Sequence, residues 1–237
     1  MYGSNFTPIH TFNMVMFFIK NYLYADLTIL KKVIKIMFIG FTGSHRTGKT
    51  TLIKELDNKL QNDKKIHILD SPSNIYYKNK NKKAVNNLTF EDRIKIQNEI
   101  LDIAIEQYEF IKDKDFDYVL IDRTPIDFIG YTLFNKDIPE VNIDVLNNEY
   151  FDYKEKCINI FHMYFDYIVY IQPGIKQVKN SISMETNKIL TDKLDSIMGG
   201  LIFNNIEYSK IIHIKRYNTK LEDRLNYVYE VIKDDTL

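Results

Sequence analysis

The sequence predicts an α/β fold in which one five-stranded parallel sheet is covered by helices on both faces. Short runs of apolar, often β-branched residues alternate along the chain with longer runs whose apolar residues recur at helical spacing. Strands that alternate with helices form βαβ units, and such units build parallel sheets. The 237 residues, 45% of them hydrophobic, are enough for one domain with a sizeable core.

Each expected element has its own sequence signal. The expected strands are residues 33–39, 66–69, 118–121, 167–171 and 211–214. The first helix begins near Lys49, and its apolar stripe is formed by Leu52, Ile53, Leu56 and Leu60. The later helices are expected at residues 89–112, 126–134, 143–164, 185–198 and 221–232. The Lys- and Asn-rich residues 77–87 predict a solvated loop.

We expect one domain, residues 34–237, preceded by an N-terminal appendage, residues 1–33. Residues 14–30 are apolar but carry Lys20, Asn21 and Asp26, so this stretch is too short and too polar to predict a membrane span. A helix that lies on a membrane surface is the alternative for this stretch. The single cysteine, Cys157, excludes an intramolecular disulfide and favours a reducing compartment, so we expect a cytoplasmic protein.

The charge balance bears on the class of partner. Lys and Arg together number 32, as do Asp and Glu, which gives a formal net charge of zero. Proteins that coat nucleic acid are usually strongly basic, so this balance disfavours a nucleic-acid partner and leaves only a local basic patch open.

A glycine-rich segment between the first strand and the first helix carries the strongest chemical signal. It matches the pattern G-x-x-x-x-G-K-[ST], in which backbone N–H groups and a helix N-terminus surround phosphate groups. The residues expected to bind the phosphates of ATP are Gly43, Ser44, His45, Arg46, Thr47, Gly48, Lys49, Thr50 and Thr51. Lys49 is expected to bridge the β- and γ-phosphates, and Thr50 to ligate Mg²⁺. The alternative is a turn that caps an ordinary helix.

Two carboxylates follow predicted strands. Asp122 ends the third strand, where it can hold Mg²⁺ or accept a proton, and the adjacent Arg123 can neutralise phosphate charge. Asp70 ends the second strand and is expected to orient or activate the hydroxyl of an acceptor. A helix cap at Asp122 and a plain turn at Asp70 are the alternatives. Asp127, one helical turn beyond Arg123, is a further candidate for the acceptor pocket.

Two segments, residues 39–52 (IGFTGSHRTGKTTL) and 119–128 (VLIDRTPIDF), resemble the P-loop nucleoside and nucleotide kinase superfamily. The likeness is greatest to thymidylate-kinase-like and ribosylnicotinamide-kinase-like AAA-type proteins. This resemblance implies a three-layer P-loop fold, metal, base or substrate-phosphate roles for Asp122 and Arg123, a lid around residues 172–203, and a homodimer by analogy. One departure is that the lid of this superfamily usually supplies Arg, whereas this chain has no Arg between Arg123 and Arg216.

The sequence leaves three functions open. The first is phosphoryl transfer from Mg-ATP to a small nucleoside or nucleoside monophosphate, which the positions of Asp70, Asp122 and Arg123 favour. The second is a kinase that acts on a hydroxyl of a polynucleotide or modified base. The third is a P-loop ATPase whose turnover depends on a partner.

Overall fold

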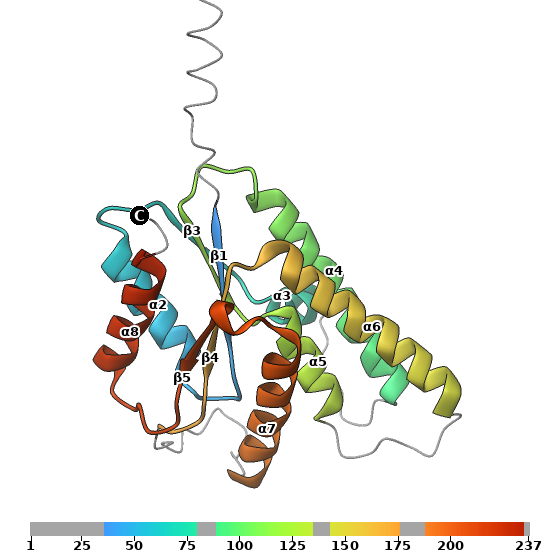
Figure 1. Ribbon diagram of the computed structural model, residues 1–237. Coiled ribbons are helices and arrows are strands. Elements are labelled where there is room, and N and C mark those ends of the chain that lie inside the picture. The colour runs from blue at the N-terminus through green and yellow to red at the C-terminus, as the bar shows by residue number, and fades with distance from the viewer. Residues whose placement is uncertain (1–35, 80–88, 135–142, 176–187, 235–237) are drawn as a thin grey trace, which may run out of the picture. The chain divides into compact units, whose positions relative to one another are not determined.

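The computed structural model describes residues 36–79, 89–134, 143–175 and 188–234. Its five strands form one parallel sheet in the order β2-β3-β1-β4-β5 (Figure 1). The strands are β1 (Met37–Thr42), β2 (Ile66–Leu69), β3 (Tyr118–Asp122), β4 (Tyr167–Ile171) and β5 (Ile211–Ile214). β1, which leads into the glycine-rich segment, therefore lies in the middle of the sheet. The predicted fold class is confirmed.

Helices cover both faces of this sheet, which gives three layers (Figure 1). On one face lie α2 (Lys49–Leu60) and α8 (Leu221–Asp234). The other face is covered by α3 (Pro72–Asn79), α4 (Phe90–Ile111), α5 (Pro125–Leu133), α6 (Ile143–Tyr164) and α7 (Lys188–Asn205). A short 3-10 helix, η1 (Tyr208–Lys210), precedes β5.

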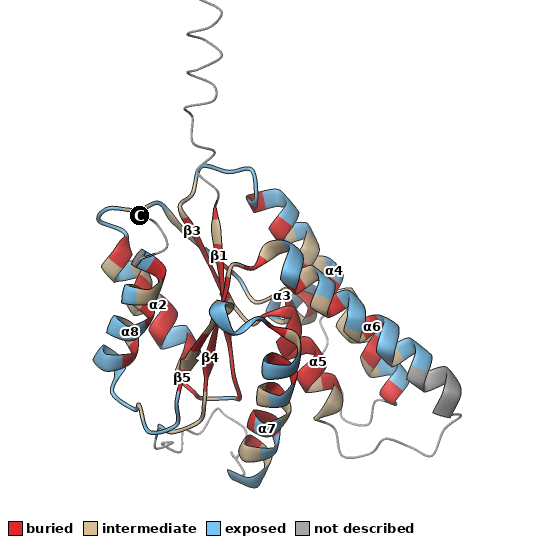
Figure 2. Ribbon diagram, in the orientation of Figure 1, coloured by how far each residue is buried: buried red, intermediate tan, exposed pale blue. Residues whose placement is uncertain are grey.

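The strands are apolar on both sides because each side faces a helical layer. Along β3, Val119 and Ile121 pack toward the α3–α7 layer, whereas Tyr118 and Leu120 pack toward α2 and α8. This alternation follows from the two-residue period of a strand. It explains why β1, β3 and β4 are buried over almost their whole length, whereas the edge strands β2 and β5 are partly exposed (Figure 2).

Local sequence signals set several helix ends. Thr89 caps α4: its Oγ1 accepts the N–H of Asp92, and the Asp92 carboxylate accepts the N–H of Thr89. At α5, Pro125 occupies the first turn, where its missing N–H costs nothing. The carboxylate of Asp127 accepts the N–H of Thr124 at 2.8 Å and so closes the turn between β3 and α5.

Three element boundaries differ from the prediction. β1 was expected at residues 33–39, but it continues to Thr42 because Phe41 and Thr42 still pair with β3 and β4; residues 33–35 lie outside the described part. Residues 77–79 were expected in a loop and instead belong to α3, which begins at Pro72 and buries Tyr76. The rest of that predicted loop, residues 80–87, is not described.

The third difference concerns the helix predicted at residues 185–198, within the predicted lid, residues 172–203. The second half of this lid belongs to α7, which buries Leu194, Met198 and Leu201 against the core and continues to Asn205. The apolar spacing of α7 thus serves core packing, and the lid itself stays a prediction. Residues 176–187 and the N-terminal residues 1–35 lie outside the described part, so the predicted appendage stays a prediction. Within the described ranges, no helix is both long enough and apolar enough to cross a membrane.

Candidate active site

The predicted site residues meet at the carboxyl edge of the sheet, where β1, β3 and β2 end side by side. Phe41 pairs with Asp122, and Leu69 pairs with Ile121, so the segments that follow these three strands leave the sheet next to each other. A pocket of about 390 Å³ opens there. Its lining comprises His45, Arg46, Thr47, Gly48, Lys49, Thr50, Thr51, Ser71, Asn74, Asp122 and Arg123.

The glycine-rich segment forms a compact loop between β1 and α2. Gly43, Arg46 and Gly48 have positive φ angles of 141°, 59° and 88°, a region that glycine enters without steric cost. Gly48 then caps α2, and its carbonyl accepts the N–H of Leu52 at 2.9 Å. The loop therefore ends at a helix N-terminus whose first N–H groups and dipole favour an anion.

Lys49 is buried inside this loop, with 6% of its surface exposed. Its Nζ donates to the carbonyls of Gly43 at 2.9 Å and Ser44 at 2.8 Å. Burial, followed by the nearby charge of Arg123, lowers the pKa of Lys49 to about 8. The ammonium group is thus held inside the loop, where burial makes its charge costly.

Thr50 and Asp122, which come from α2 and β3, lie in direct contact. The hydroxyl of Thr50 donates to Oδ2 of Asp122 at 2.6 Å. A hydroxyl and a carboxylate oxygen at this spacing are hard oxygen ligands, which suit Mg²⁺ bound through one or two protein groups, phosphates and water. In the described ranges, no cluster of three or more His, Cys, Asp or Glu side chains could hold a metal by protein ligands alone. The residues present therefore fit a magnesium ion that a phosphate ligand helps to hold.

Arg123 adopts a strained backbone and a fixed side chain beside the loop. Its φ of 88° is unusual for a residue with a side chain. The guanidinium lies 4.7 Å from the ring centre of Tyr131, and its Nη1 lies 3.8 Å from Oδ1 of Asp127. The ring of His45 also packs against Tyr131, with the two ring centres 5.1 Å apart. These contacts direct a planar cation toward the pocket.

The charge state of His45 follows from this neighbourhood. Partial desolvation lowers the pKa of His45, and the charges of Arg123, Lys49 and Arg46 lower it further. The imidazole is therefore neutral at neutral pH, and the positive charge of the loop comes from its Lys and Arg side chains.

Asp127 was a candidate for the acceptor pocket, but it does not line the pocket at the sheet edge. It is fully buried, and its Oδ2 accepts both the N–H and the hydroxyl of Thr124, at 2.8 and 3.0 Å. Its role is to hold the turn after Asp122 and Arg123. The spacing of Thr124 and Asp127 is that of a capping box, which is the sequence signal that could have indicated this role.

The acceptor side of the pocket is less enclosed. Asp70 is exposed at the end of β2, and its backbone carbonyl accepts the amide of Gln107 at 3.1 Å. The pocket is lined instead by its neighbours Ser71 and Asn74, where α3 begins. The predicted role of Asp70 toward an acceptor hydroxyl stays a prediction.

Two arginines that carried no motif have fixed side chains, Arg224 against the phosphate loop and Arg216 against α7. Arg224, in the first turn of α8, is 1% exposed, and its Nη1 donates to the carbonyl of Thr47 at 2.8 Å. Arg216, which follows β5, binds the carboxylates of Asp192 at 2.8 Å and Asp195 at 3.0 Å on α7. Sequence reasoning missed both, because neither lies near the phosphate loop along the chain.

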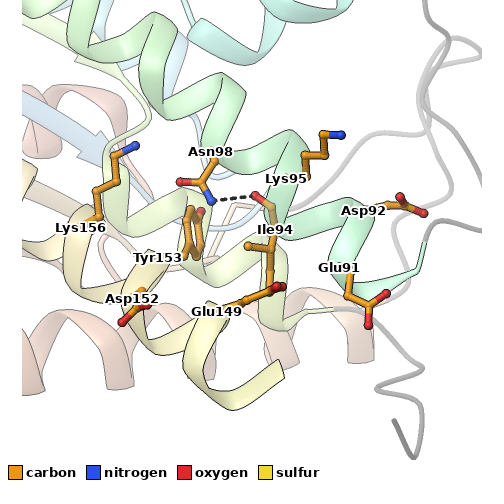
Figure 3. Close-up of a pocket in the computed structure, with 9 residues that line it drawn as sticks. All are labelled: Glu91, Asp92, Ile94, Lys95, Asn98, Glu149, Asp152, Tyr153 and Lys156. Carbon is orange, nitrogen blue, oxygen red and sulfur yellow. Dashed lines mark hydrogen bonds between the residues drawn. The ribbon is translucent and has the colours of Figure 1, made fainter. Parts of the chain in front are cut away.

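A second hollow, of about 600 Å³, lies away from this edge, between α4 and α6 (Figure 3). It is lined by side chains of both charges: Glu91, Asp92, Ile94, Lys95, Asn98, Glu149, Asp152, Tyr153 and Lys156. Asn98 is turned back to its own helix, where its amide donates to the carbonyl of Ile94 at 3.2 Å. This groove holds no group of the phosphate loop, so the chemistry is assigned to the sheet edge.

Comparison with known proteins identifies the family of this chain and solved structures with the same fold. A family model described as an AAA domain matches residues 38–165, more than half of the chain. The chain belongs to the AAA-domain family. Solved structures of thymidylate kinases and of NadR share its fold, which agrees with the predicted resemblance. No curated protein sequence matches the chain.

Three solved structures illustrate the fold of this AAA-domain protein. Thymidylate kinase from Candida albicans is 14% identical, with a TM-score of 0.58 over 85% of this chain and 93% of the kinase. Thymidylate kinase from Ehrlichia chaffeensis is 16% identical, with a TM-score of 0.54 over 84% of this chain and 99% of the kinase. The NadR protein in complex with NAD and AMP-PNP is 16% identical, with a TM-score of 0.56 over 84% of this chain but only 50% of NadR. Identities this low establish the fold alone.

Proposed function

We propose that this protein transfers the γ-phosphoryl group of ATP to a nucleoside or nucleoside monophosphate, with Mg²⁺ as cofactor. The observation that carries the proposal is the 2.6 Å contact between Thr50 and Asp122, directly beside the buried Lys49 of the phosphate loop. A hydroxyl and a carboxylate from two different elements, side by side next to the phosphate loop, support a site for a nucleotide-bound magnesium ion.

Each residue has a distinct task in this reaction. The N–H groups of residues 43–51 hold the phosphates, and Lys49 exchanges the carbonyls of Gly43 and Ser44 for phosphate oxygens. Thr50 and Asp122 would hold Mg²⁺, whose charge would offset the negative charge of the phosphates. Arg123, fixed by Tyr131 and Asp127, neutralises charge on the transferring or accepting phosphate.

The acceptor is proposed to approach from the side of α3. Ser71 and Asn74 offer hydrogen-bonding groups at the pocket wall, and Asp70 lies next to them on the adjoining strand end. Thymidylate kinases and NadR share the fold, which favours a nucleoside or nucleotide as acceptor over a protein or a sugar. A cytoplasmic location, where ATP is abundant, belongs to the same proposal.

The test is transfer of labelled γ-phosphate from Mg-ATP to a panel of nucleosides, nucleoside monophosphates, ribosylnicotinamide and oligonucleotides. Lys49→Ala is the control, since it removes the ammonium group from the loop. A labelled small-molecule product that disappears with Lys49→Ala supports the proposal and names the acceptor. A product found only on oligonucleotides, or no labelled acceptor at all, overturns it.

One observation favours a second candidate, a partner-regulated ATPase. Arg216, the first arginine in the sequence after Arg123, is held by Asp192 and Asp195 of α7. If that arrangement persists with ATP bound, the superfamily's lid arginine has no counterpart in Arg216. ATP hydrolysis to free phosphate, without transfer to any acceptor in the panel, is the result that this candidate predicts.

A further inference from the structure

Helix α8 places one arginine directly beneath the phosphate loop. The Arg224 guanidinium donates through Nε to the carbonyl of Asn218 at 2.5 Å and through Nη1 to the carbonyl of Thr47 at 2.8 Å. A methyl group added at Gly48 would lie 3.6 Å from Nη1, so the cation is in contact range of the loop backbone. The residue is almost completely buried, and its Nη2 has no hydrogen-bond partner among the described residues.

The charge of Arg224 is difficult to explain by stability alone. No ion pair joins it to a carboxylate in the described ranges, and burial lowers its pKa from its very high ordinary value. A buried cation without an opposite charge is destabilising, and an uncharged side chain of similar length would fill the same space. We therefore look for the effect of this cation in the phosphate loop, whose Thr47 carbonyl accepts its hydrogen bond.

The geometry of the peptide bond shows what that action is. A trans peptide is planar, so its carbonyl and the N–H of the next residue point in opposite directions. Arg224 holds the carbonyl of Thr47 toward α8, and the N–H of Gly48 must then point away from α8. A charged donor on the carbonyl also polarises the peptide and makes that N–H a stronger donor to an anion.

The other loop carbonyls are held differently. Those of Gly43 and Ser44 accept from Lys49, which must leave them to reach a phosphate, and that of Gly48 accepts the N–H of Leu52 within α2. Arg224 binds its carbonyl from outside the loop, from a separate element. Its contact is therefore compatible with an occupied loop.

We propose that Arg224 is a positioning residue that locks the Thr47–Gly48 peptide so that the Gly48 N–H is directed to the bound phosphates. The identity of that anion as the triphosphate of ATP rests on the proposed function. The orientation of the peptide itself does not, because it is a property of the protein without ligand.

The first experiment measures the Gly48 amide directly by NMR in protein labelled with ¹⁵N-glycine, whose eight glycines make assignment practical. Arg224→Lys and Arg224→Met are compared with Lys59→Met. Lys59 joins α2 to α8 through Asn226 at 2.7 Å without touching the loop, so its variant controls for looser packing of α8. We expect the Gly48 resonance to move in both Arg224 variants and to stay in place in Lys59→Met.

The second experiment measures binding of Mg-AMP-PNP and of adenosine by calorimetry. Loss of a charge-assisted hydrogen bond predicts triphosphate affinity weakened by about 10- to 100-fold in Arg224→Met, less in Arg224→Lys, with adenosine binding unchanged. A variant that merely loosens the fold lowers the melting temperature without this selective loss. Arg224→Lys, which keeps the charge, serves if Arg224→Met does not fold.

The outcomes separate the two proposals. Wild-type affinity in a folded Arg224 variant, with an unmoved Gly48 resonance, overturns the positioning role even if the kinase reaction is established. A moved resonance and a selective loss of triphosphate binding support it even if no acceptor is ever phosphorylated. If the wild type binds no nucleotide, the resonance alone decides, since it is recorded without ligand.

Discussion

The two halves of the pocket are built in different ways. The phosphate half consists of one continuous loop whose groups are fixed by hydrogen bonds: Lys49 by two carbonyls, Thr50 by Asp122, and Thr47 by Arg224. The acceptor half consists of short segments at separate strand ends, where Asp70 is exposed and Ser71 and Asn74 start a helix. The first half is a consequence of the fold, whereas the second depends on a few surface residues.

This difference has a functional consequence. A preorganised phosphate half suits any ligand with a polyphosphate, because backbone N–H groups and Lys49 read charge and shape only. Selectivity for one acceptor must then come from the open half, where side chains can change without disturbing the core. Substitutions in the two halves should therefore separate ATP binding from acceptor use.

The largest effect is expected from Asp122→Asn in the phosphate half. Without the carboxylate, the Thr50–Asp122 pair no longer balances the charge of Mg²⁺, and phosphoryl transfer should fall by about 10²- to 10³-fold. Initial rates at saturating ATP and several Mg²⁺ concentrations measure this loss.

Thr50→Ala supplies the matching comparison for Asp122→Asn. If the two residues hold one ion together, the double variant should lose little more than the more damaged single variant, because coupled residues are not additive. Fully additive losses would show that the 2.6 Å contact does not form a functional unit.

The next effect is expected from Asp70→Asn in the acceptor half. A carboxylate that activates or orients a hydroxyl contributes about 10²-fold or more to transfer, so the turnover rate should fall by that order. The affinity for Mg-AMP-PNP should stay at the wild-type value, because Asp70 lies outside the loop. Unchanged turnover would reduce Asp70 to a plain turn residue.

A smaller effect should follow from pH, and only in the phosphate half. Burial and the charge of Arg123 lower the pKa of Lys49 to about 8, so the lysine loses its charge as the pH rises through that value. Bound phosphates favour the charged form, which means that ATP binding takes up a proton above this pH and weakens by roughly tenfold per further pH unit. Calorimetry at about pH 7 to 9.5 in two buffers with different ionisation enthalpies measures both quantities. Affinity that is flat over this range, with no proton uptake, would contradict the prediction.

The same contrast explains what could be predicted from sequence. The phosphate loop, the Thr50–Asp122 pair and the parallel sheet follow from local patterns: a fixed spacing of glycines, and a carboxylate directly after an apolar strand. Each of these signals lies within a short stretch of the chain, so a single sequence suffices to find it.

The contributions that were missed depend on long-range packing. Arg224 lies 177 positions after Thr47, and nothing in the sequence of α8 indicates that its one arginine reaches the loop. The core packing of α7 was not predicted, because the same residue types occur in lids and in cores and only tertiary packing distinguishes these settings. Burial of a polar side chain at a distant element is a tertiary property that periodicity does not encode.

The smallest effect concerns Asp127, whose carboxylate supports both halves by holding the turn that carries Asp122 and Arg123. Burial raises the pKa of Asp127, so the folded protein binds this proton more readily than the unfolded chain does. Its ionisation therefore costs stability at neutral pH, and stability is regained as the pH falls through the folded value. Asp127→Asn, which keeps an acceptor oxygen but carries no charge, should avoid this cost at neutral pH and remove the gain at low pH. In Thr124→Val, the carboxylate loses a hydroxyl donor and its charged form is less favoured, so the gain on acidification should increase. Urea unfolding across the acidic range measures the three slopes, and identical slopes would mean that Asp127 is ionised as easily in the fold as in the unfolded chain.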